Sequence, residues 1–134
     1  MKYFGTDGFR GEANVTLTAD HAFKIGRFLG HYFQDGTHRV RVLVGKDTRL
    51  SGYMYETALA AGLTASGADV YEIHVTTTPS ISYLIRKENF DFGIMITASH
   101  NPYTDNGIKV INGQGHKLEE EIEEPVSYTH LTLP

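Results

Sequence analysis

The five residues Phe92–Ile96 (FGIMI) form a near-continuous apolar run with no charged side chain. Such a short apolar run is typical of a strand that is covered on both faces, as in parallel sheets flanked by helices. Two β-rich runs, one around Val40–Val44 and one over Val70–Val75, precede it, and Ile108–Ile111 follows it. The central run therefore requires a layered structure with helices on both sides of a sheet.

Apolar residues recur at helical spacing in three segments between the predicted strands. The first segment begins after Thr18, which is a suitable N-cap, and ends near Gly36. The second covers 53–65, and the third is a short segment after Pro79, which suits a helix N1 position. The alternation predicts an α/β domain with a mixed, mostly parallel sheet flanked by helices. The glycine-rich segment 4–12 is interpreted as a loop.

Length and composition limit the class of protein. A chain of 134 residues predicts one domain. The net charge of −4 argues against nucleic-acid binding, which normally needs a basic surface. There is no cysteine, no signal-peptide pattern and no apolar run long enough to span a bilayer. These features predict a soluble cytoplasmic protein that binds neither nucleic acid nor membrane.

The last ten residues differ in character from the rest. Pro125 follows an acidic cluster, and residues 126–134 match nothing before them. This stretch can be encoded by a DNA string that resembles the transposase adapter of sequencing libraries. We therefore expect a native domain over 1–124, incomplete at its C-terminal end, and an adapter-derived tail over 125–134. A natural strand-like tail is the alternative.

Ser99 is the first candidate for chemistry, because it follows the buried run in a turn fixed by Pro102. A phosphoserine here would carry about −1.5 to −2 charges and would need a cation nearby. Lys109 on the next predicted strand is a candidate, on the face opposite Ile108 and Val110. A well-formed turn without chemistry is an equal alternative. A hydrolase triad fits poorly, because His100 is adjacent to Ser99 and the Gly-x-Ser-x-Gly elbow is missing.

Other segments contain candidate side chains. Arg10, between Gly5 and Gly11, offers a fork of donors suited to phosphate, although a structural Arg–Asp pair is an alternative. Gly45–Arg49 is no P-loop, and a structural role for its Asp47 and Arg49 in holding backbone is favoured. His100 is the only one of seven histidines beside a candidate site, and the seven show no metal-ligand spacing.

Three segments together resemble the α-D-phosphohexomutase superfamily in order and spacing: FGTDGFRG at 4–11, GKDTR at 45–49, and TASHNP with DNGIK at 97–109. The resemblance covers about 1–124 and implies the first domain of such an enzyme. It implies interconversion of glucosamine 6-phosphate and glucosamine 1-phosphate through a bisphosphate. The serine matching Ser99 is phosphorylated in that family and holds Mg²⁺ partly through its phosphate. The residues matching Arg10 and Lys109 line the site, and His100 is included with them as a catalytic candidate.

The departure from the family is in length. Its members have four domains, and the metal-binding aspartates, the sugar-recognition loop and the last phosphate-binding loop lie in the later three. We therefore expect the substrate to be a phosphosugar and the partners to be the remaining mutase domains. The chain alone is expected to have no turnover. A phosphomannomutase or phosphoglucomutase, or a non-catalytic phosphate-binding module, remains an alternative.

Overall fold

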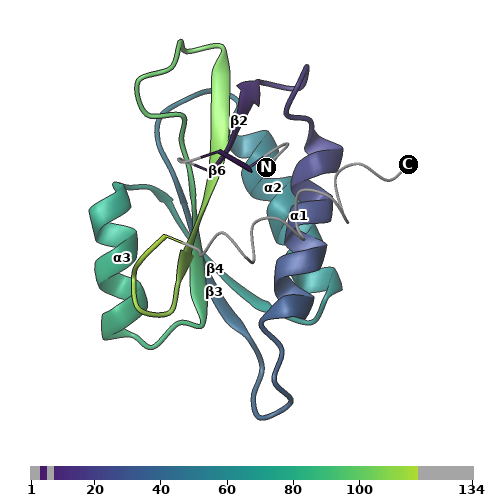
Figure 1. The fold of residues 1–134 in the computed structure, drawn as a ribbon, viewed down its shortest axis with the longest axis vertical. Helices are drawn as coiled ribbons and strands as arrows, with labels where there is room; N and C mark the ends of the chain where they lie inside the picture. Colours follow the sequence, from purple (N-terminus) through teal and green to yellow (C-terminus); the bar gives the residue numbers. More distant parts are fainter. Residues whose placement is uncertain (1–3, 6–7, 118–134) are drawn as a thin grey trace.

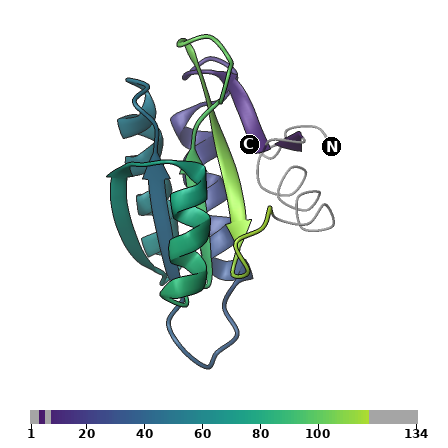
Figure 2. The ribbon, with the colours of Figure 1, turned by 90° about the vertical axis from the view of Figure 1, so that its left-hand side faces the viewer.

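A computed structural model describes residues 4–5 and 8–117, which form one six-stranded sheet with three helices. The strand order is β1-β2-β6-β5-β3-β4. Helices α1 and α2 cover one face of the sheet, and α3 covers the other (Figures 1 and 2). The elements are β1 (Phe4–Gly5), β2 (Gly8–Glu12), α1 (Ala19–Tyr32), β3 (Arg41–Lys46), α2 (Gly52–Ala65), β4 (Asp69–Val75), α3 (Thr78–Lys87), β5 (Phe92–Ile96) and β6 (Asp105–Asn112).

The predicted mixed α/β sheet is confirmed. β3 pairs in parallel with both β4 and β5, whereas β6 pairs antiparallel with β5 and with β2, and β1 pairs antiparallel with β2. β2, β3, β4 and β5 therefore run in one direction, and β1 and β6 run in the other. The topology brings the carboxyl ends of β3 and β5 side by side, since Lys46 is in register with Ile96.

The apolar run at Phe92–Ile96 is β5, and all five of its residues are buried, as predicted. Its side chains divide between the two faces of the sheet, as the period of a strand requires. Ile94 and Ile96 belong to the core under α1 and α2. Met95 belongs to the smaller core under α3, with Ile81 and Ile85.

The helix starts follow their capping residues. Thr18 caps α1, and its side chain accepts a hydrogen bond from the His21 backbone while His21 bonds back to the Thr18 N–H. Thr77 caps α3 with a side chain that accepts from the Ser80 backbone N–H, so Pro79 is the second helical residue rather than the first. The predicted end of the first helix at Gly36 is wrong. α1 ends at Tyr32, and Gly36 takes a φ of +81° in the following loop.

The interpretation of 4–12 as a loop is also wrong. Gly8–Glu12 forms strand β2, with Phe9 opposite Ile108 and Arg10 opposite Gly107. A Cβ on Gly107 would lie 2.7 Å from the Phe9 carbonyl oxygen and 2.6 Å from that of Thr97. The glycine is needed here for close backbone packing. β6 accordingly begins at Asp105, three residues before its predicted start.

Two expectations concern the C-terminal part of the chain. The acidic cluster and the expected tail at 125–134 lie outside the described residues. Among the residues that are described, no helix has the length and apolarity that a membrane crossing requires.

The loop between α1 and β3 gives a prediction about pH. His38 Nε2 lies 2.8 Å from Asp91 Oδ1, and this hydrogen bond raises the pKa of the imidazole above its ordinary value. The stabilising effect of a raised pKa is complete below the unfolded-state value of about 6.5 and is lost as pH rises through the folded-state value. At about pH 5.5 we expect the chain to have a higher melting temperature than a His38→Gln variant. At about pH 8.5 we expect the two melting temperatures to be equal. Thermal melts at both pH values check this. A difference that grows with pH would contradict it.

Candidate active-site loop

Ser99 lies in the loop between β5 and β6, the green loop at the top of Figure 1, at the carboxyl ends of the parallel strands. Its side chain is exposed, and its φ is +52°. A residue other than glycine in the left-handed region costs of the order of 1–3 kcal/mol and is retained where the surroundings impose it. The strained serine is therefore held in place by specific contacts.

The first of these contacts run through Thr97 and Asp47. The Ser99 backbone N–H donates to Thr97 Oγ1 at 3.1 Å, and the Thr97 hydroxyl donates to Asp47 Oδ2 at 2.7 Å. Asp47 also accepts from the Arg49 backbone N–H at 3.1 Å. Because Asp47 follows β3 and Thr97 follows β5, the pairing of two strand ends fixes the backbone just before the serine.

Arg49 holds the far side of the loop. Its guanidinium donates to the carbonyl oxygens of Ser99 at 2.8 Å and Pro102 at 2.6 Å, and also to those of Asn101 and Asp105. Its Nε donates to Asp47 Oδ2 at 3.2 Å, and its side chain is only 11% exposed. The preferred interpretation of Asp47 and Arg49 as residues that hold neighbouring backbone is thus confirmed.

Arg10 reaches the same loop from β2. Its Nη1 donates to Asn101 Oδ1 at 3.3 Å, and Asn101 Nδ2 donates to Asp105 Oδ2 at 3.2 Å. The side chain of Arg10 is half-buried. The structure therefore brings Arg10 and Ser99, 89 residues apart, to a single loop, which Arg10 contacts through Asn101.

Lys109 and His100 are placed differently. Lys109 lies on β6 opposite Met95, while Ile108 and Val110 pack in the core under α1 and α2. Lys109 thus faces the α3 side of the sheet, as the alternation with Ile108 and Val110 predicts. His100 is exposed beside Ser99. Within the described part of the chain, neither side chain makes a hydrogen bond to the serine loop.

Lys46 is a cation that the sequence reasoning did not select. It is the last residue of β3 and is 98% buried, since only 2% of its surface is exposed. Its Nζ lies 3.8 Å from the centroid of the Tyr53 ring, a cation–π contact. Its position directly before Asp47 was the available signal. Together with Arg10 and Arg49 it gives this edge of the described structure three cations beside the two carboxylates of Asp47 and Asp105, a balance that suits an anionic ligand.

Magnesium needs hard oxygen ligands in octahedral arrangement. The exposed Ser99 hydroxyl offers one such oxygen. The nearby carboxylates are already in use, because Asp47 accepts from Thr97 and Arg49, and Asp105 accepts from Asn101. Among the described residues the loop therefore fits Mg²⁺ only through Ser99, and the other ligands would have to come from elsewhere.

A separate group does bring three ligand types together. Glu56 on α2 and Glu72 and His74 on β4 place their ligand atoms within 4.8 Å of one another. The expectation that the histidines show no metal-ligand spacing missed this group. The signal was the i, i+2 spacing of Glu72 and His74, which puts both on one face of a strand. Glu56, 16 residues earlier, could not be assigned to them from spacing.

Comparison with known proteins gives a consistent result. Residues 1–129 match the family described as Phosphoglucomutase/phosphomannomutase, alpha/beta/alpha domain I. The phosphoglucosamine mutases of Lachnoclostridium phytofermentans and Lachnospira eligens are 69% and 65% identical to the chain over 122 and 125 residues. The matches cover 91% and 90% of this chain but 27% of each relative.

Solved structures agree with this comparison. A phosphoglucomutase/phosphomannomutase family protein from Burkholderia thailandensis superimposes with a TM-score of 0.81 at 31% identity. The superposition covers 93% of this chain and 29% of the other. The fold and the sequence similarity therefore occur together in relatives that are more than three times as long.

Proposed function

Because the chain belongs to the phosphoglucomutase/phosphomannomutase family through its alpha/beta/alpha domain I, we propose that it forms the phosphoserine-bearing domain of a phosphoglucosamine mutase. The reaction would interconvert glucosamine 6-phosphate and glucosamine 1-phosphate. The single observation that carries the proposal is the exposed Ser99 at φ +52°, held by Arg49 and Asp47 at a cation-rich edge of the sheet.

In the proposed reaction, phosphorylated Ser99 transfers its phosphoryl group to a hydroxyl of the sugar phosphate. The bond between phosphorus and Ser99 Oγ breaks as a bond from phosphorus to the sugar oxygen forms, and the sugar hydroxyl releases its proton to a base. The resulting bisphosphate reorients in the site and returns its other phosphoryl group to Ser99 Oγ. Net, one phosphate has moved between two positions of the sugar, and the serine phosphate is restored.

The roles of the other residues follow from the needs of phosphoryl transfer, which depends mainly on positioning and charge stabilisation. Arg10 would neutralise phosphate oxygens beside the loop, and Lys109 would neutralise charge or assist proton transfer. His100 would donate a hydrogen bond to the substrate from its exposed position. Mg²⁺ would supply charge neutralisation when bound through the Ser99 phosphate, with its other ligands from domains that the relatives possess beyond the matched length.

Those domains are the partners that we propose. Large apolar side chains stand exposed around the serine edge, and they include Leu50 at 91% and Tyr103 at 85%. Such exposure is typical of a surface that another part of a protein covers. The chain spans about a quarter of its relatives, so we propose that turnover requires the remainder. A cytoplasmic location belongs to the same proposal and agrees with the lack of cysteine.

The test uses a chimera in which residues 1–124 replace the matching segment of the L. phytofermentans enzyme. The chimera is dephosphorylated and then incubated with glucosamine 1,6-bisphosphate and Mg²⁺, and the phosphate is located by peptide mass spectrometry. We expect it on Ser99 and not on Ser80, an exposed serine in the first turn of α3, which is the internal control. Phosphate absent from Ser99 would refute the proposal.

A further inference from the structure

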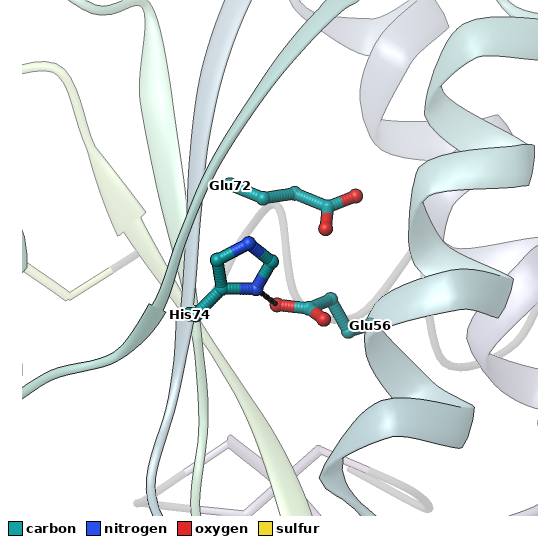
Figure 3. A group of neighbouring side chains, drawn as sticks. All are labelled: Glu56, Glu72 and His74. Carbon is teal, nitrogen blue, oxygen red and sulfur yellow. Dashed lines mark ion pairs between the residues drawn. The ribbon is translucent and has the colours of Figure 1, made fainter.

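We propose that Glu56, Glu72 and His74 form a binding site for a divalent transition-metal cation of the zinc class. Figure 3 shows the three side chains converging between helix α2 and the edge strand β4. This site is separate from the serine loop, and the inference does not depend on the proposed mutase activity.

The buried carboxylate of Glu56 carries the inference. Glu56 is 96% buried, since its relative exposure is 4%, yet its Oε2 has no hydrogen-bond partner among the described residues. A buried ionised carboxylate costs several kcal/mol unless it is paired and hydrogen-bonded. His74 Nδ1 lies 3.3 Å from this oxygen; no hydrogen bond joins the two atoms, and they form an ion pair only when the imidazole is protonated. The oxygen points toward His74, and the Glu72 carboxylate lies within 4.8 Å of the pair, so a cation placed among the three would satisfy it (Figure 3).

The fold places the other two ligands opposite Glu56. Glu72 and His74 are two residues apart on β4, on the face that packs toward α2 together with Val70. The pairing of β3 with β4 shifts between Val44 and Gly45, and His74 takes a φ of +59° at this irregularity. The bulge therefore turns the imidazole while the strand continues to Val75.

The electrostatics favour a cation as well. The carboxylates of Glu56 and Glu72 place their ligand oxygens within 4.8 Å of each other. Two carboxylates that converge in this way repel each other when both are ionised. A divalent cation between them removes the repulsion and compensates the buried charge.

The donor set indicates the kind of metal. One imidazole nitrogen with two carboxylate oxygens is a set that zinc accepts, with a remaining position for water. Magnesium prefers oxygen ligands only and retains several waters, so the histidine disfavours it. Glu72 and His74 are exposed, which gives the ion a path from solvent.

The experiment titrates the 134-residue chain with Co²⁺, followed by visible absorption, and then displaces Co²⁺ with Zn²⁺. We expect one equivalent of each metal. Glu56→Gln and His74→Gln should each weaken binding by more than about tenfold, because even outer-shell partners of a metal change its affinity by about 10–100-fold. His38→Gln is the matched control, since His38 is an exposed histidine beside Asp35 and Asp91, and it should leave binding within about twofold.

Two results would overturn the site. One is that Glu56→Gln and His74→Gln both bind the metal with the same affinity as the wild-type chain. The other is no saturable binding by the wild-type chain, which would mean that Glu56 and His74 form an ion pair only. Circular dichroism of the metal-free variants verifies that they are folded. If Glu56→Gln is unfolded, the exposed His74→Gln decides, because its side chain is 64% exposed and its loss leaves the core unchanged.

Discussion

Replacing Arg49 with methionine is expected to slow phosphoryl transfer to Ser99 by about 100-fold or more in the chimeric enzyme. The guanidinium donates to four carbonyl oxygens of the serine loop, and methionine offers no donor to any of them. Ser99 holds a left-handed backbone conformation that is itself costly in energy. Without these contacts nothing compensates that cost, so the serine is free to change conformation. A shift of about 1 Å in a reacting group can cost about 100-fold in rate.

The effect should fall on the loop rather than on the whole domain. Arg49 lies at the end of the sheet and contributes nothing to either apolar core. Hydrogen bonds to a charged donor are each worth about 1.5–3 kcal/mol at most, and the freed carbonyls near the surface can bond to water. We therefore expect faster amide exchange at Asn101, whose N–H donates to the Ala98 carbonyl, with a small change in melting temperature.

Arg39→Met is the matched control for this substitution. Arg39 also donates three hydrogen bonds, but they go to the Asp69 carboxylate on the surface, where the arginine side chain is 68% exposed. Its loss should leave phosphorylation of Ser99 within about twofold, since exposed ion pairs are worth about 0–1 kcal/mol. Equal rates for Arg49→Met and the wild type would contradict the role given to Arg49.

The pattern of apolar residues predicted the elements whose side chains decide their packing. Phe92–Ile96 was found correctly because a strand buried on both faces must be apolar throughout. Strand β2 was missed because its pairing depends on backbone approach, which needs glycine opposite Arg10 and leaves no alternating pattern. Gly36 misled the prediction of the helix end because it serves the turn after α1, and Phe33 instead stacks on Phe92.

The candidate site divides in the same way. Strand ends are predictable, so Ser99 and Asp47 could be placed at one edge of the sheet. The contacts of Arg49 with four carbonyl groups depend on the path of the loop, which has no signature in residue spacing. The group around Glu56 depends on how α2 packs beside β4, and that angle is set by helix contacts in three dimensions.

Those helix contacts give the second large effect. Replacing Gly62 with valine is expected to lower the free energy of unfolding by about 3 kcal/mol or more, the upper end for an overpacked core. A Cβ on Gly62 would lie 2.2 Å from the Phe23 carbonyl oxygen and 2.8 Å from the Arg27 amide nitrogen. Both are backbone atoms of α1, so no side chain can rotate away. Gly26 on α1 faces Gly62 and would itself place a Cβ 2.6 Å from the Leu59 carbonyl oxygen.

The clash can be relieved only if α1 and α2 move apart, and this separation would open the core that both helices cover. Leu29 and Leu59, each fully buried, would lose contacts across the interface. Ala61→Val is the matched control, because residue 61 is an exposed neighbour on α2 and pays only the weak helix preference of valine, below about 0.7 kcal/mol. Urea unfolding of both variants measures the difference. Equal urea midpoints for the two variants would show that α1 and α2 are not packed backbone to backbone. The same result would contradict the position of α2 that directs Glu56 toward β4.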